Sequence, residues 1–256
     1  MKQRKALIAA NWKMFKTIAE AASFTQSLQQ EVSPLADREV VIAPPYTALA
    51  AVRNAIWRSD FRLASQNCHW EDKGAFTGEV SGIMLKDVGC DYAILGHSER
   101  RQLFGETDEI VQKKLASVLR IGLLPILCVG EVLEERESGR TFTVVSLQLE
   151  RALEGVNTDQ AERLAIAYEP VWAIGTGKTA TPQQAQEVHS FIRERCASLW
   201  DKKVANGIRI MYGGSVKPDN VDTLMVQSDI DGMLVGGASL ELGSFKRIVQ
   251  YQLRGE

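Results

Sequence analysis

Glu169 is an ionisable side chain at the point where an apolar segment gives way to a glycine-containing one. Residues 164–168 are apolar enough for a strand buried on both faces, and Pro170 favours extended backbone at the residue before it. We therefore expect Glu169 at the C-terminal tip of a strand, partly shielded from water. A carboxylate in such a place is a candidate for acid–base chemistry, although a helix cap or an ion pair would use the same residue type.

The segment that follows this glutamate has the composition of a lid. Apolar side chains that can shield a site from water come first, and Gly175 and Gly177 permit backbone geometries needed for close approach to a ligand. Thr181, Pro182 and Gln184 then match an N-cap, a first-turn proline and a capping-box glutamine, which predicts that a helix begins there. The expected lid consists of Pro170, Val171, Trp172, Ala173, Ile174, Gly175, Thr176, Gly177 and Lys178.

Two glycine pairs, at 213–214 and 236–237, follow the last two apolar segments of the chain. Backbone N–H groups in such turns, together with a short helix N-terminus, form the usual phosphate site of a parallel barrel. Ser215 and Gly237 would contribute donors to that site. Either pair in isolation is more simply a turn, so only the combination is informative.

The overall composition limits the classes of partner. The chain has 256 residues, a formal net charge of -2 and a pI near 6.0, so it offers no global basic field for nucleic acid or an anionic membrane. The four cysteines are far apart and form no C-x-x-C pair, which predicts reduced thiols and a cytoplasmic protein. The apolar runs at 6–10 and 123–129 are too short for a signal peptide or a membrane span.

Strand-like and helical segments alternate along the whole chain. The helical periodicity is clearest after Thr107, where it ends at Gly122, and again over residues 185–196. This alternation fits a parallel (β/α)8 barrel, although an open doubly wound sheet has the same local pattern. No linker divides the chain, so we expect one domain over residues 1–256. The expected strands are 6–10, 40–43, 61–65, 92–95, 124–129, 164–168, 208–212 and 232–235.

Polar residues and glycines gather where these strands end, which is where barrels of this kind carry their sites. Taken alone, Lys13 reads as a solvated surface charge and His97 as a structural histidine. Convergence on one pocket is what would make them functional. The residues concerned are Asn11 and Lys13 after the first strand, His97 after the fourth, Glu169 after the sixth, residues 213–215 after the seventh, and Gly236 and Gly237 after the eighth.

Five motifs occur in a specific order and spacing: NWKM at 11–14, GHSERR at 96–101, YEPVWAIGTGK at 168–178, YGGSV at 212–216 and LVGGA at 234–238. On these motifs the chain resembles the triosephosphate isomerase family along essentially its whole length. The chain departs from the usual family pattern at Ala10, where glycine is usual, and at Phe15, where asparagine is common. Both positions leave the packing of the first loop, and the dimer contacts near it, open.

The resemblance implies the roles of particular residues. Glu169 would be the general base, His97 a neutral electrophile and Lys13 an electrostatic stabiliser. The substrate-binding residues would be Asn11, Lys13, Gly175, Ser215, Gly236 and Gly237. Residues 98–101 could begin a short helical turn whose amides face the His97 ring. His69 and His189 match no catalytic motif of the family and read as surface or helix residues.

The resemblance also implies an activity and an assembly. Family members interconvert dihydroxyacetone phosphate and D-glyceraldehyde 3-phosphate through an enediolate, in glycolysis and gluconeogenesis, without a cofactor or a metal. They form homodimers, in which the loop 67–79 of one subunit would insert into its partner near the partner's counterparts of Asn11 and Lys13. Thr77 would then lie at the tip of that loop, in the dimer interface.

Two kinds of rival fit parts of the pattern. Another phosphosugar enzyme on the same barrel, such as a Schiff-base lyase, needs a lysine buried on a central strand, whereas Lys13 follows a strand in a polar loop. A metal-dependent epimerase needs converging histidine and aspartate ligands, and the three histidines supply no such cluster. A non-catalytic phosphate-binding barrel would not need Lys13, His97 and Glu169 together.

Overall fold

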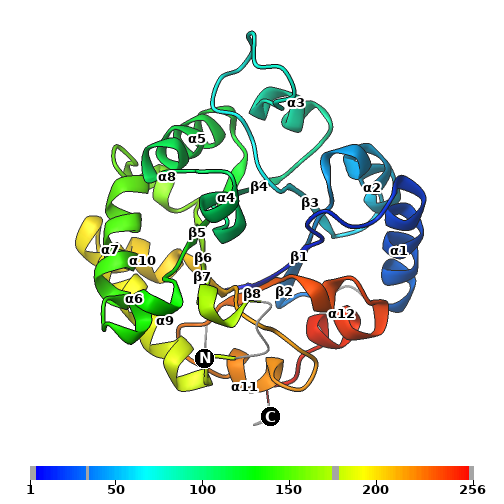
Figure 1. Ribbon diagram of the computed structural model, residues 1–256. Helices are drawn as coiled ribbons and strands as arrows, with labels where there is room; N and C mark the ends of the chain where they lie inside the picture. The colour runs from blue at the N-terminus through cyan, green and yellow to red at the C-terminus, as the bar shows by residue number, and fades with distance from the viewer. Residues whose placement is uncertain (1–3, 33–34, 175–178, 254–256) are drawn as a thin grey trace.

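The structure, a computed structural model, describes residues 4–32, 35–174 and 179–253, and these residues form a closed barrel of eight parallel strands (Figure 1). The strands follow one another in chain order around the barrel, and β1 pairs with β8 to close it. Each expected strand is confirmed within two residues at either end. The strands are β1 (Ala6–Asn11), β2 (Arg38–Ala43), β3 (Arg62–Ser65), β4 (Tyr92–Leu95), β5 (Leu124–Val129), β6 (Ala165–Tyr168), β7 (Arg209–Tyr212) and β8 (Gly232–Val235).

Helices surround the barrel as an outer layer, and the loop between β3 and α3 projects beyond this ring (Figure 1). The α-helices are α1 (Ile18–Glu31), α2 (Leu49–Ile56), α3 (Gly82–Asp87), α4 (Ser98–Leu103), α5 (Asp108–Ile121), α6 (Leu133–Glu137), α7 (Thr141–Ala152), α8 (Thr158–Ala161), α9 (Pro182–Leu199), α10 (Lys202–Gly207), α11 (Val221–Met225) and α12 (Leu242–Val249). Three 3-10 helices join them: η1 (Tyr46–Ala48), η2 (Val171–Ala173) and η3 (Gly237–Ser239).

Side-chain alternation along the strands divides the core into two layers. In β1, Leu7 and Ala9 point into the barrel and belong to a core cluster that fills its interior. Ile8 and Ala10 point outward and pack in the larger layer between the strands and the helices. Ala10 is fully buried there, so this departure from the family pattern is absorbed by packing against the helical layer. The next inward position of β1 is Asn11, at the C-terminal end of the barrel.

The helix boundaries follow the local signals in the sequence. Thr107 caps α5 by accepting a hydrogen bond from the amide of Ile110, and Gly122 ends that helix with a left-handed φ of 89°. Thr181 and Gln184 form the expected capping box at the start of α9. This capping box confirms the predicted start of the helix after residue 181.

The histidines outside the motifs are less exposed than expected. His189 lies in helix α9, as predicted, but it is completely buried. His69 lies neither in a helix nor on the surface. It is 7% exposed, and its ring stacks on Trp70 and contacts Phe76 at a tilt. The surface assignment of His69 is therefore wrong, because two aromatic neighbours in its own loop cover the ring.

The cysteines are unpaired and buried, at positions 68, 90, 128 and 196. Among the described residues, no group of three histidine, cysteine, aspartate or glutamate side chains is arranged to hold a metal ion. Among the helices that the structure describes, none is long and apolar enough to cross a membrane.

Candidate active site

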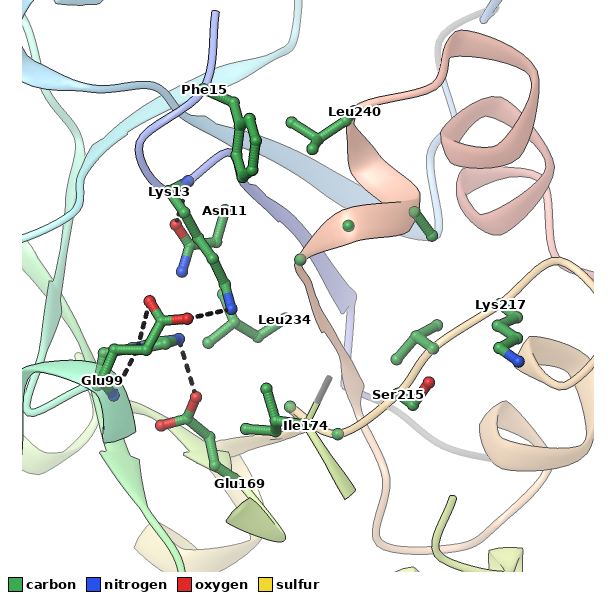
Figure 2. A pocket seen from close by; sticks show the side chains of 17 residues that line it. Asn11, Lys13, Phe15, Glu99, Glu169, Ile174, Ser215, Lys217, Leu234 and Leu240 are labelled. Carbon is green, nitrogen blue, oxygen red and sulfur yellow. Dashed lines mark hydrogen bonds and ion pairs between the residues drawn. The ribbon is translucent and has the colours of Figure 1, made fainter. Parts of the chain in front are cut away.

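A cavity of about 530 Å³ opens at the C-terminal ends of the strands. It brings together the residues that the sequence singled out at the strand ends, and Figure 2 shows Lys13, Glu169 and Ser215 on different sides of it. The described lid residues 170–173 and Thr77 do not line it. The lining residues are Asn11, Lys13, Phe15, His97, Glu99, Glu169, Ile174, Gly213, Gly214, Ser215, Val216, Lys217, Leu234, Gly236, Gly237, Ala238 and Leu240. The predicted convergence of the strand-end residues on one pocket is confirmed.

Glu169 follows β6 directly and is 2% exposed. Its carboxylate accepts a hydrogen bond from the backbone amide of Ser98 at 2.9 Å, and the Ser98 hydroxyl lies 3.3 Å from the other oxygen. Gly213 leaves room for this side chain, since a Cβ at that position would stand 2.9 Å from the Glu169 Cγ. The carboxylate is therefore desolvated and held by hydrogen bonds at one wall of the cavity.

His97 caps the short helix α4, whose amides face its ring. The Glu99 backbone N–H donates to Nδ1 of His97 at 3.2 Å, and Nε2 lies 3.0 Å from Oε1 of Glu169. A ring nitrogen that accepts from an amide carries no proton, so the neutral ring has its proton on Nε2. That N–H points at the wall of the cavity where Glu169 lies, as a hydrogen-bond donor.

Lys13 enters the cavity from the loop after β1 with a left-handed φ of 51°. Its Nζ forms an ion pair with Glu99 at 2.5 Å, drawn as a dashed line in Figure 2. The loop backbone is held from two sides: the Asn11 side chain accepts from the Lys13 amide at 3.1 Å, and Gln66 donates to the Lys13 carbonyl at 2.9 Å. These contacts fix a strained backbone and direct the ammonium group into the cavity.

The opposite wall of the cavity is built from the loops after β7 and β8. Ser215 lies in the first of these loops, and Gly236 and Gly237 lie at the start of η3 in the second. Gly236 sits directly under the lysine, because a Cβ there would be 3.4 Å from Lys13 Cε. Exposed backbone amides next to a cation suit a small anion such as a phosphate.

The first part of the segment expected to form a lid is tied to a buried carboxylate. Trp172 in η2 donates from Nε1 to Glu131 at 2.9 Å, and the Tyr168 hydroxyl donates to the same oxygen at 3.0 Å. Glu131 is completely buried, which raises the pKa of its carboxyl, and these two donors oppose that rise. Ile174, at the end of η2, lines the cavity. Gly175, Thr176, Gly177 and Lys178, which include a predicted phosphate binder and most of the lid tip, lie outside the described residues.

Several groups in the site were not identified from the sequence. Ser98 and Glu99 stand beside His97 in the same motif, and this adjacency was the only signal that pointed to them. Gln66, which follows β3, had no signal at all, because its role depends on the position of the β1 loop. Phe15 lies on the cavity wall together with Leu240, which gives this departure from the family pattern a definite place.

Comparison with known proteins matches residues 6–252 to the model of one family, described as triosephosphate isomerase. The chain belongs to this family. A relative named triosephosphate isomerase from Moorella thermoacetica is 56% identical over 248 residues, which cover 97% of this chain and 99% of the relative. Relatives of the same name from Syntrophotalea carbinolica and Geotalea uraniireducens are 54% and 53% identical, again over 97% of this chain and 99% of each relative.

Membership of the triosephosphate isomerase family agrees with the arrangement of the cavity. One wall carries a carboxylate and an imidazole, and the other carries glycine amides and a serine, with Lys13 between them. A triose phosphate is short enough to span such a cavity. The phosphate and the two reacting carbons would then face opposite walls.

Proposed function

We propose that this chain interconverts dihydroxyacetone phosphate and D-glyceraldehyde 3-phosphate through an enediolate. The observation that carries the proposal is the placement of Glu169, His97 and Lys13 in one cavity with Ser215 and the glycines of the β8 loop. Family membership supports the same reaction. The reaction belongs to glycolysis and gluconeogenesis, and we propose the cytoplasm as its location.

In the proposed reaction Glu169 removes a proton from C1 of dihydroxyacetone phosphate. The electrons of that C–H bond form the C1–C2 double bond, and the carbonyl oxygen on C2 gains negative charge. Returning the proton to C2, while a proton moves from the C1 oxygen to the C2 oxygen, yields the aldehyde. The Glu169 carboxylate accepts a hydrogen bond from the backbone amide of Ser98, and it must break this hydrogen bond to reach the substrate.

His97 and Lys13 stabilise the charge that develops on the oxygens. The neutral His97 ring donates from Nε2, and its tautomer is set by the Glu99 amide at Nδ1. Lys13 supplies a positive charge that Glu99 orients. General-base catalysis contributes only ~10²- to 10⁴-fold, so these preorganised groups carry much of the remaining acceleration. Asn11, Ser215, Gly236 and Gly237 bind the substrate and its phosphate, and the chemistry uses no cofactor or metal.

The deciding experiment is a coupled assay with dihydroxyacetone phosphate in the presence of a chelator. Formation of glyceraldehyde 3-phosphate supports the isomerase. Phosphate binding without turnover would indicate a non-catalytic barrel. No turnover of dihydroxyacetone phosphate, together with metal-dependent inversion at a stereocentre of a larger ketose phosphate, would indicate an epimerase. Borohydride trapping of a lysine adduct would indicate a lyase.

We propose that residues 170–178 form a lid over the bound phosphate, with the Gly175 amide as a phosphate donor. Deleting residues 174–177 should leave Glu169 and His97 in place but expose the enediolate to water and to free rotation. Isomerisation should fall sharply, and a larger share of turnover should end in phosphate loss and methylglyoxal. NMR of the products measures this ratio, and an unchanged ratio would show that the segment does not protect the intermediate.

We also propose a homodimer in which Thr77 lies in the interface. A second cavity of about 250 Å³ adjoins Asn11 and Lys13, and the large apolar side chains of Met14 and Phe104 beside it are 93% and 67% exposed. The loop that carries Thr77 projects from the barrel (Figure 1) and is a suitable occupant of a partner's second cavity. Apolar side chains this exposed are typical of a surface that another chain covers.

Thr77→Arg tests this assembly, because an unpaired charge is costly to bury in an interface. Sedimentation should then give a mass near 28.3 kDa, and activity should fall with the loss of the dimer. Thr158→Arg, at the start of α8, is a matched control that should sediment like the unchanged chain. A Thr77→Arg variant that stays dimeric would place the interface elsewhere.

A further inference from the structure

Two non-glycine residues of the described chain have a left-handed φ, and both lie in the loop between β1 and α1. Lys13 is one of them, and Lys16, with φ of 72°, is the other. Side chains with a Cβ rarely adopt this conformation, and it persists where surrounding contacts hold it. Asn11 and Gln66 hold the backbone of Lys13. Those of Lys16 reach a different part of the site.

The Lys16 side chain extends from the loop between β1 and α1 and forms a hydrogen bond with the loop after β8. Its Nζ donates to the carbonyl of Leu240 at 3.0 Å, 224 positions away in the sequence. Leu240 is the C-cap of η3, and η3 begins at Gly236 and Gly237. These glycines belong to the cavity wall built from the loops after β7 and β8, which is called the phosphate wall below because the proposed function places the phosphate there. The two loops thus meet twice: at Lys16 on Leu240, and at Lys13 over Gly236.

Aromatic rings hold the ammonium group in this position. Nζ of Lys16 lies 4.2 Å from the centroid of the Phe24 ring in α1 and 5.4 Å from that of Trp12, distances suited to cation–π attraction. The two rings pack edge to face, and Trp12 is completely buried beside Lys13. Burial lowers the pKa of Lys16, and the nearby carboxylates of Glu20 and Glu241 act in the opposite direction.

Resting on the function proposed above, we propose that Lys16 is a positioning residue that holds the Lys13 loop in register with the phosphate wall. Lys13 approaches the substrate from one loop, and the glycine amides approach its phosphate from the other. A displacement of about 1 Å between such groups can cost up to ~10²-fold in rate. Lys16 lies outside the cavity lining and acts through these two loops.

The test compares three substitutions at this position. Lys16→Met removes the charge and the hydrogen bond, and Lys16→Gly also removes the demand for a strained φ. Lys16→Arg keeps a cation that can reach both the rings and the carbonyl. We expect kcat/KM for dihydroxyacetone phosphate to fall about 10-fold in the methionine and glycine variants, with KM raised and kcat lowered, and to recover partly in the arginine variant.

Lys246→Met is the matched control. Lys246 in α12 joins α1 through Glu31 at 3.0 Å, and this pair lies outside the cavity. Equal losses of thermal stability in Lys16→Met and Lys246→Met, with kcat/KM unchanged in both, would make Lys16 purely structural and overturn the proposal. Full activity in Lys16→Gly would overturn it as well, since backbone conformation alone would then suffice.

Calorimetry with inorganic phosphate separates this proposal from the proposed reaction. We expect the Kd of phosphate to rise several-fold in Lys16→Met and Lys16→Gly and to stay constant in Lys246→Met. Phosphate binding can be compared even if the unchanged chain has no isomerase activity. Absence of that activity would refute the proposed function but not the role of Lys16. A phosphate Kd that is the same in all variants overturns the role of Lys16.

Discussion

The two ends of the barrel each bury a carboxylate, but they surround it differently. At the N-terminal ends of the strands, Asp231 is ion-paired with Arg4 at 2.7 Å and with Arg193 at 2.6 Å. At the C-terminal ends, Glu169 has no lysine or arginine of the described chain within ion-pairing distance. It is held by an amide and a hydroxyl of Ser98 and by the His97 ring.

This difference separates a carboxylate fixed by ion pairs from one held only by neutral hydrogen-bond donors. The Asp231 carboxylate also accepts from the Ile210 amide at 3.0 Å, so moving it would break two ion pairs and one hydrogen bond around a fully buried carboxylate. Glu169 is held by hydrogen bonds from Ser98 and by its contact with His97, and each of these can be exchanged for a contact with a ligand in the open cavity beside it. Asp231 and Glu169 therefore differ in how each carboxylate is held: Asp231 by ion pairs and Glu169 by neutral donors.

The largest effect should come from breaking the structural pair. Asp231→Asn removes a buried negative charge that pairs with the buried Arg193 and the partly buried Arg4, and we expect the free energy of unfolding to fall by about 3–5 kcal/mol. The kcat/KM of the folded protein should not change. Denaturant titration and a steady-state assay measure the two quantities.

The control for this variant is Glu150→Gln, which breaks the pair between Glu150 and Arg195 on the surface. Both side chains are partly exposed, so the loss should be no more than about 1 kcal/mol. If Asp231→Asn costs no more than this control, the N-terminal end of the barrel is not held by its ion pairs.

Glu169→Gln should have the opposite signature. The amide can keep the bond from Ser98, so stability should change little, but it cannot accept the proton from carbon. We expect kcat to fall by at least ~10²-fold, about 3 kcal/mol, with a much smaller change in substrate binding. Near-normal turnover would show that Glu169 is not the base.

The smallest effect concerns His189, a buried group that belongs to neither end. Burial lowers its pKa to about 4, and its ring packs against Tyr168 and Tyr212 behind the site. Below its ordinary pKa of about 6.5 the unfolded chain binds a proton that the folded chain refuses until about pH 4. The stability that this group contributes is complete above pH 6.5 and is lost as the pH falls.

We therefore expect the titration of His189 to make the free energy of unfolding about 2 kcal/mol lower at pH 5 than at pH 7. His189→Gln lacks this titration, so denaturant titrations at both pH values should show a smaller loss in the variant than in the unchanged chain. Equal losses in the two proteins would mean that His189 takes up a proton in the folded state too.

Side chains whose environment is set by nearby residues could be predicted from the sequence, whereas side chains covered or paired by distant residues could not. Glu169 could be placed because an apolar strand, a proline and a glycine-containing segment mark its surroundings locally. The burial of His69 could not be predicted, because its cover comes from Phe76, seven positions further along a loop without regular structure. The ion pairs of Asp231 were equally hidden, since Arg4 and Arg193 come from opposite halves of the chain.

By itself the sequence determined the order of strands and helices and the residues at the strand ends. Those features depend on neighbours within a few positions: side-chain alternation in the strands, the Thr107 and Thr181 caps, and the left-handed Gly122. The assignment to one family rested on motifs of the same local kind.

Only the tertiary structure decided which groups touch. Ser98 reaches Glu169 across 71 positions, Lys13 reaches Glu99 across 86, and Lys16 reaches Leu240 across 224. Each contact depends on closing the sheet into a barrel, which brings the loops after β1, β4, β6 and β8 to one end. Hydrogen bonds act over about 3 Å, so no local pattern in the chain can specify them before that closure has occurred.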